Sequence, residues 1–170
     1  AASDVYKRQT NISNRVSSAA SVQLAGELFL RSNSAVASQQ TLASLTLLGD
    51  RPTLNLVSSG PAVTLNASSL NMFQDGVFVI SGSTLSSSAR FFIDEGSSYL
   101  LNNIFPMTIG NGSLLTYDNA VGVRPLSAGE YVSSIVVGSD TTNNVRLVSS
   151  ATTGIHLPTS FNSLTMNDAT

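Results

Sequence analysis

Carboxylates are the side chains with which this sequence could do chemistry, and two of its ten acidic residues, Asp94 and Glu95, are adjacent. Glycoside hydrolysis needs two carboxyl groups held about 5–9 Å apart on either side of one bond. Neighbouring residues of a strand instead face opposite sides of the sheet. Because Gly96 follows, the pair is predicted to lie in a turn and not to form a catalytic site.

Most of the other aspartates also lie in turn-like contexts, beside Gly, Asn, Thr or Arg: Asp50, Asp75, Asp118, Asp140 and Asp168. Aspartate is common in such positions without any function, because its side chain bonds to the backbone of the turn. A fold could still bring several of them together. A polysaccharide-active enzyme therefore remains an alternative, and it requires three or more carboxylates in one groove.

Nucleophiles and ligands are scarce. His156, in TGIHLPT, is the only histidine, and no Gly-x-Ser-x-Gly elbow accompanies it to form a triad. The loop IGNGSLL (109–115) lacks the lysine and helix of a phosphate loop, so Asn111-Gly112 is predicted to form a hairpin or corner turn. With no cysteine in the chain, we predict no catalytic, cofactor-binding or metal-binding residues and no cofactor.

Composition points to an exported protein. Only 11% of the residues are charged, against about 25% in typical soluble domains, and Ser, Thr and Asn supply the polarity. The net charge is −2 and the arginines are scattered, which argues against binding nucleic acid. No apolar stretch is long enough for a membrane span. Tyr99, Tyr117 and Tyr131 could stack on sugars in a glycan-binding domain, although packing at coil edges is the simpler prediction.

Short runs of alternating apolar residues, closed by turn residues, predict an all-β fold. Paired positions that share a face are Leu45 and Leu47, Leu54 and Leu56, Val63 and Leu65, and Val77 and Val79. The strand modules 42–50 and 161–169 are similar, which favours stacked coils, a parallel β-helix, over the alternative, a β-sandwich. Between 127 and 140, SAGEYVSSIVVGSD could carry a helical turn, but its Val and Ile content fits a strand as well.

Segment 104–150 resembles a block that recurs in the autotransporter-associated β-strand repeat proteins, which are very large bacterial proteins. The matching positions are Ile104, Pro106, Gly112, Thr116, Tyr117, Gly122, Val123, Arg124, Leu126, Glu130, Tyr131, Asn144, Val145, Arg146 and Leu147. The Gly-rich unit that names the family is not in this sequence.

This resemblance implies a right-handed parallel β-helix in a non-enzymatic stalk or passenger region with an adhesive role. The expected location is secreted or on the bacterial cell surface, held at the outer membrane through a missing C-terminal region. The expected partners are cell-surface or glycan ligands bound through the longer protein, and neighbouring β-helix coils at both ends. Neither nucleic-acid binding nor direct membrane insertion is expected.

The first nine residues, AASDVYKRQ, differ from the rest and carry the only lysine, Lys7. They resemble, residue for residue, the translation of a transposase-type sequencing adapter. We therefore predict that residues 1–9 are not native and form no strand of the stack. Residues 10–170 are then expected to be a single β-helix fragment, internal to a longer protein.

Overall fold

The computed structural model describes residues 13–72, 76–133, 141–148 and 160–167. The chain forms two compact units, Ala1–Pro125 and Leu126–Thr170. Strands dominate both, and the described residues contain no α-helix, only the short 3-10 segments η1 (Gly96–Tyr99) and η2 (Ala128–Glu130). The opening nine residues and His156 lie outside the described residues.

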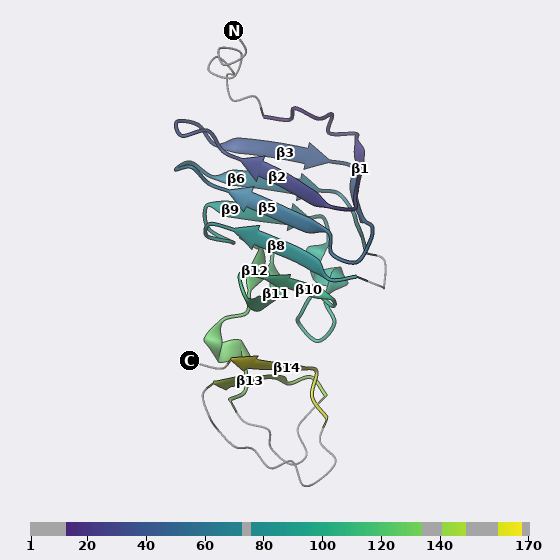
Figure 1. Ribbon diagram of the computed structural model, residues 1–170, viewed down its shortest axis with the longest axis vertical. Coiled ribbons are helices and arrows are strands. Elements are labelled where there is room, and N and C mark those ends of the chain that lie inside the picture. Colours follow the sequence, from purple (N-terminus) through teal and green to yellow (C-terminus); the bar gives the residue numbers. More distant parts are fainter. Residues whose placement is uncertain (1–12, 73–75, 134–140, 149–159, 168–170) are drawn as a thin grey trace. The chain divides into compact units, whose positions relative to one another are not determined.

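The first unit is a parallel β-solenoid of three successive coils (Figure 1). Each coil contributes three strands, which in chain order are β1 (Ser21–Leu24), β2 (Glu27–Arg31) and β3 (Ser38–Leu42), then β4 (Ser44–Leu47), β5 (Thr53–Val57) and β6 (Val63–Ala67), then β7 (Leu70–Met72), β8 (Phe78–Gly82) and β9 (Ala89–Ile93).

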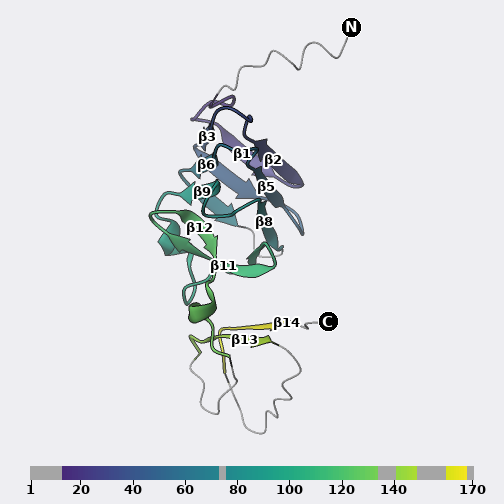
Figure 2. The same ribbon diagram turned by 90° about the vertical axis from the view of Figure 1, so that its left-hand side faces the viewer.

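Strands stack on their equivalents in the next coil, giving the ladders β1-β4-β7, β2-β5-β8 and β3-β6-β9, all parallel. Figure 2 shows two of these ladders side by side. Leu45 pairs with Leu70 and Val63 with Ala89, so one coil takes about 25 residues. The predicted parallel β-helix is confirmed. The β-sandwich alternative is wrong, because each ladder joins successive coils in parallel and the described residues form no pair of antiparallel sheets around the core.

The core lies inside the coils, where alternate side chains of each strand point. Leu45, Leu54, Leu56 and Leu65 are fully buried, as their alternation predicts. In β8 the buried residues are instead Phe78 and Ile80, so the face shared by Val77 and Val79 is the outer one. The run VFVI is apolar at every position, and therefore its pattern does not distinguish the two faces.

After the third coil the chain adds one more parallel strand and then reverses its direction. The strand β10 (Thr108–Gly110) pairs in parallel with β8, and then β11 (Ser113–Asp118) and β12 (Gly122–Pro125) follow as an antiparallel meander. The turn between β10 and β11 has positive φ at Asn111 (49°) and Gly112 (73°), as a type I′ hairpin requires. The hairpin predicted from Asn111-Gly112 is confirmed.

The second unit contains a parallel pair, β13 (Asn144–Val148) and β14 (Ser163–Asn167). The segment predicted to carry a helical turn or a strand begins with η2, which Ser127 and Glu130 stabilise as a capping box. Both similar strand modules form strands, β4 and β14. Their equivalent apolar residues differ, however: Leu47 is buried, whereas Met166 is 72% exposed.

Candidate functional site

Asp94 and Glu95 lie in the turn that follows β9, and both are exposed. Glu95 adopts a left-handed backbone conformation with φ of 53°, which fits a tight turn and not a strand. Their side chains are therefore presented to solvent beside the 3-10 segment η1.

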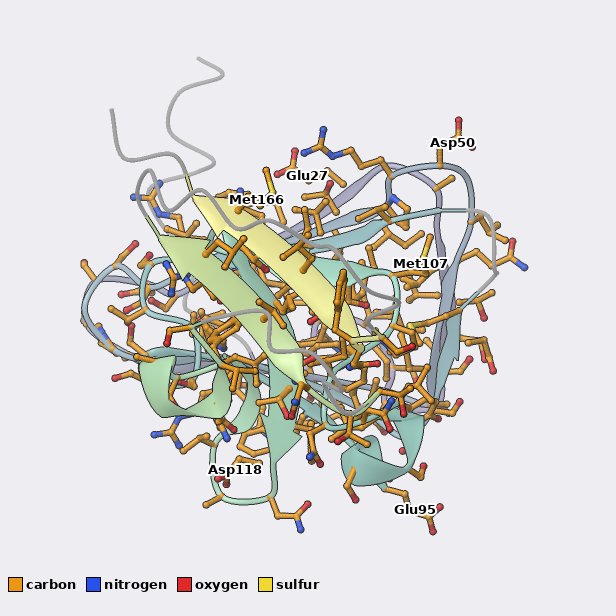
Figure 3. The ribbon with its side chains drawn as sticks, turned by 90° about the horizontal axis from the view of Figure 1, so that it is seen from below. Glu27, Asp50, Glu95, Met107, Asp118 and Met166 are labelled. Carbon is orange, nitrogen blue, oxygen red and sulfur yellow. The ribbon has the colours of Figure 1, made fainter. Side chains whose placement is uncertain are left out.

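Other described acids serve local contacts. The Glu27 Oε1 atom accepts a hydrogen bond from the Asn55 amide at 3.1 Å, and Asp118 Oδ1 accepts one from the Ala120 N–H at 2.7 Å. Figure 3 shows that Glu27, Asp50, Glu95 and Asp118 point outward at separate places. The described residues contain no group of three metal-ligating side chains. Asp75, Asp140 and Asp168 lie outside the described residues.

Tyr99 and Tyr117 pack at the edges of coil strands. The Tyr99 hydroxyl accepts a hydrogen bond from the Leu70 N–H at 3.2 Å. The Tyr117 hydroxyl accepts one from the Ile93 N–H at 3.2 Å and donates one to the Ile93 carbonyl at 2.8 Å. In the second unit, the Arg146 guanidinium lies over the Tyr131 ring, 5.5 Å from its centroid.

The contacts of Tyr99 and Tyr117 form part of a cap on the C-terminal end of the stack, where the third coil would otherwise leave backbone groups unpaired. At the end of β8, the Asn111 side chain donates to the Gly82 carbonyl at 3.0 Å and accepts from the Gly82 N–H at 3.3 Å. The Tyr99 hydroxyl bonds the Leu70 N–H of β7, and the Tyr117 hydroxyl bonds both backbone groups of Ile93 in β9. All three strands of the last coil therefore have hydrogen-bond partners on their outer side.

The cap fits closely against the third coil (Figure 2). A Cβ atom placed on Gly122 would lie 2.3 Å from the Phe91 carbonyl oxygen, and one on Gly96 would lie 2.4 Å from the Tyr117 ring. The Tyr117 ring also makes an edge contact with Phe105 at 6.3 Å between centroids. The hairpin is thus part of the folded unit.

Removing the Tyr117 hydroxyl tests the cap. We expect Tyr117→Phe to lower the free energy of unfolding by about 1–3 kcal/mol, because it leaves both the N–H and the carbonyl of Ile93 without their partner while the ring keeps its packing. Tyr99→Phe removes a single bond and should cost less, about 0.5–1.5 kcal/mol. Urea titrations followed by circular dichroism measure both values. Equal losses of unfolding free energy in the two variants would contradict the two stabilising bonds assigned to the Tyr117 hydroxyl.

The N-terminal end of the stack is only partly covered. The Asn14 N–H donates to the Gln39 carbonyl at 2.8 Å, and the Gln40 side chain bonds both backbone groups of Val16, so β3 has a covered outer edge. Among the described residues, nothing pairs with the outer edges of β1 and β2. A cavity of about 390 Å³ opens beside β2, lined mainly by apolar side chains that include Val22, Leu28, Leu30 and Leu42.

The fold and its ends thus define a parallel β-solenoid segment with a capped C-terminal end and an open N-terminal edge. Comparison with known proteins gives no match: no family model, no curated protein and no solved structure is similar to this chain. In the part of the chain that the structure describes, no helix has the length and apolar character to cross a membrane.

Neither the cap at the C-terminal end of the stack nor the open edge at its N-terminal end was predicted from the sequence. The cap has a signal in the sequence, an Asn-Gly turn followed by two β-rich runs, which predicts antiparallel pairing after a parallel stack. The open edge has a weaker signal, the segment ELFLR at 27–31, in which opposite charges flank three apolar residues.

Proposed function

We propose that this chain is a non-enzymatic, structural segment of a large bacterial secreted or cell-surface protein, in which the β-helix acts as a stalk or passenger region. One observation carries the proposal: the three coils enclose an apolar core and present hydroxyl and amide side chains outward. Such a module adds length by repetition of its coils.

Contacts between the outer side chains of successive coils support this role. The Asn71 amide donates to Thr46 Oγ1 at 3.2 Å, and the Asn55 amide donates to the Glu27 carboxylate. These bonds connect neighbouring coils outside the backbone ladders. An adhesive role through cell-surface or glycan ligands belongs to the same proposal, and the resemblance of 104–150 to a bacterial surface family supports it.

The alternative is a polysaccharide-active or glycan-binding β-helix. Such an enzyme needs several carboxylates in one groove, and Glu27, Asp50, Glu95 and Asp118 point outward at separate places. A glycan-binding face usually offers exposed aromatic rings, whereas the Tyr99 and Tyr117 hydroxyls are bonded to strand edges. The stalk is therefore the proposal that the described residues favour.

A panel of acidic and neutral polysaccharides tests the proposal with the purified chain at micromolar concentration. We expect no release of reducing ends and no unsaturated products over a day, with an active β-helical lyase as the positive control. A glycan array and intact bacterial cells, probed with the same labelled chain, test adhesion. Turnover of any polysaccharide would contradict the non-enzymatic role, and absence of all binding would reduce the proposal to a spacer.

A further inference from the structure

Among the described residues, nothing pairs with the outer edge of β2, and its backbone groups are therefore accessible to a partner. Its neighbour β5 uses one side of the strand: the Gly26 carbonyl accepts from the Thr53 N–H at 2.8 Å, and the Ser32 N–H donates to the Val57 carbonyl at 3.0 Å. Successive residues in a parallel ladder alternate in the side to which their backbone groups point. The N–H and C=O groups of Glu27, Phe29 and Arg31 therefore point away from β5, toward the open end.

The side chains of the same three residues lie on the outer face of the sheet. Phe29 is 50% exposed, a large apolar surface for a single residue. Glu27 is positioned by Asn55, and the Arg31 Nε–H donates to Ser59 Oγ at 2.8 Å. The strand thus presents a fixed negative charge at one end, a fixed positive charge at the other and an aromatic ring midway between them.

From this arrangement we infer that the open edge binds a second copy of this chain, through antiparallel pairing of β2 with β2 about a two-fold axis at Phe29. In that register Glu27 lies opposite Arg31 of the second copy, Arg31 lies opposite its Glu27, and the two Phe29 residues face each other. Every outward-pointing backbone group of the three residues then has a partner, since hydrogen-bonded pairs in an antiparallel ladder recur at every second residue.

The two-fold axis is perpendicular to the β2 sheet, so both coil interiors lie on the same side of the joined sheets. The open cavities, with Leu28 and Leu30 on their walls, then face each other, and apolar surface is removed from water. Both copies use the same strand edge in this arrangement, so the contact closes as a dimer and does not extend as a fibre.

Swapping the charges at Glu27 and Arg31 tests the proposed register of β2 against β2. Sedimentation velocity of the full chain between about 1 and 100 μM should show a species with twice the monomer mass of 17.7 kDa. Glu27→Arg and Arg31→Glu should each weaken the dimer by about tenfold or more, since each brings like charges together at both symmetric positions. The double variant Glu27→Arg/Arg31→Glu should restore the dimer, and an equimolar mixture of the two single variants should form a heterodimer.

A second test depends on geometry and not on charge. The chain has no cysteine, so Phe29→Cys introduces a single thiol at the two-fold axis. Hydrogen-bonded antiparallel pairs have Cα atoms about 5.5 Å apart, which a disulfide can span. Mild oxidation should link two copies of Phe29→Cys, but not of Met107→Cys, a control at a position that is 54% exposed.

A chain that stays monomeric at 100 μM overturns the inference. So does a double charge variant as weakly associated as the single ones, or equal crosslinking at positions 29 and 107. Circular dichroism and urea unfolding of each variant verify that the coils remain folded. The inference does not rest on the stalk proposal, because a polysaccharide-active protein could dimerise through the same edge.

Discussion

Replacing Gly122 with alanine is expected to lower the free energy of unfolding by about 3 kcal/mol, from left-handed backbone strain together with overpacking. Gly122 has φ of 81°, and the added Cβ would lie 2.3 Å from the Phe91 carbonyl oxygen. That oxygen belongs to a strand held in a ladder by β6, so it cannot retreat without breaking backbone hydrogen bonds. The hairpin must move away instead, and Tyr117 moves with it.

Gly112→Ala is the matched control for this prediction. Gly112 has a similar φ of 73°, but its Cβ would meet no atom within 4 Å. Only backbone strain remains there, and the expected cost is about 1 kcal/mol. The difference between the two variants, measured by urea unfolding, isolates the contact between the cap and the coil. If both variants lose the same free energy, the close approach of Gly122 to Phe91 does not contribute to stability.

The second large effect is expected at Phe91, which is fully buried and makes an edge-to-face contact with Phe78 at 6.5 Å. Phe91→Ala leaves a cavity between coil and cap and should cost about 3–5 kcal/mol. The next residue, Phe92, points to the outer face of the same strand and is only half-buried. Phe92→Ala should cost about 1 kcal/mol.

The two phenylalanines are adjacent on one strand and differ only in the face to which they point. Thermal and urea unfolding of Phe91→Ala and Phe92→Ala therefore measure which face is the core. A larger loss for Phe92→Ala would mean that the strand faces the other way. Because the loss at Phe91 could approach the whole stability of a small domain, Phe91→Leu provides a milder variant. It should unfold between the wild type and Phe91→Ala.

Strand positions and most of the core could be predicted from the sequence, because runs such as SLTL and TLNL alternate cleanly between apolar and polar residues. Which face is buried could not be predicted where the alternation disappears. In VFVI both faces are apolar, so only the register with β5, which pairs Leu54 with Ile80, decides that Phe78 and Ile80 point inward. Register of this kind depends on a strand from another coil.

The two ends of the stack could not be predicted for a related reason. The hydroxyl of Tyr117 and the backbone of Ile93 are 24 residues apart, and the contact exists only when β11 lies against β9. Nothing in a local pattern distinguishes this tyrosine from one on a sugar-binding surface. The turns were easier, since Asn111-Gly112 and the Asp94-Glu95-Gly96 segment carry their conformational preference in their own residues.

The nearly constant spacing of the coils has a consequence for how fast the protein folds. In five of the six parallel strand pairs that join the three coils, the paired residues are separated by 25 or 26 positions in the chain. The entropy lost on closing each loop depends on that separation and not on total length. Each new coil can therefore dock on the previous one at a similar entropic cost, and the mean sequence distance between contacts stays the same as coils are added. Lengthening such a protein need not slow its folding, as lengthening a globular β-domain would.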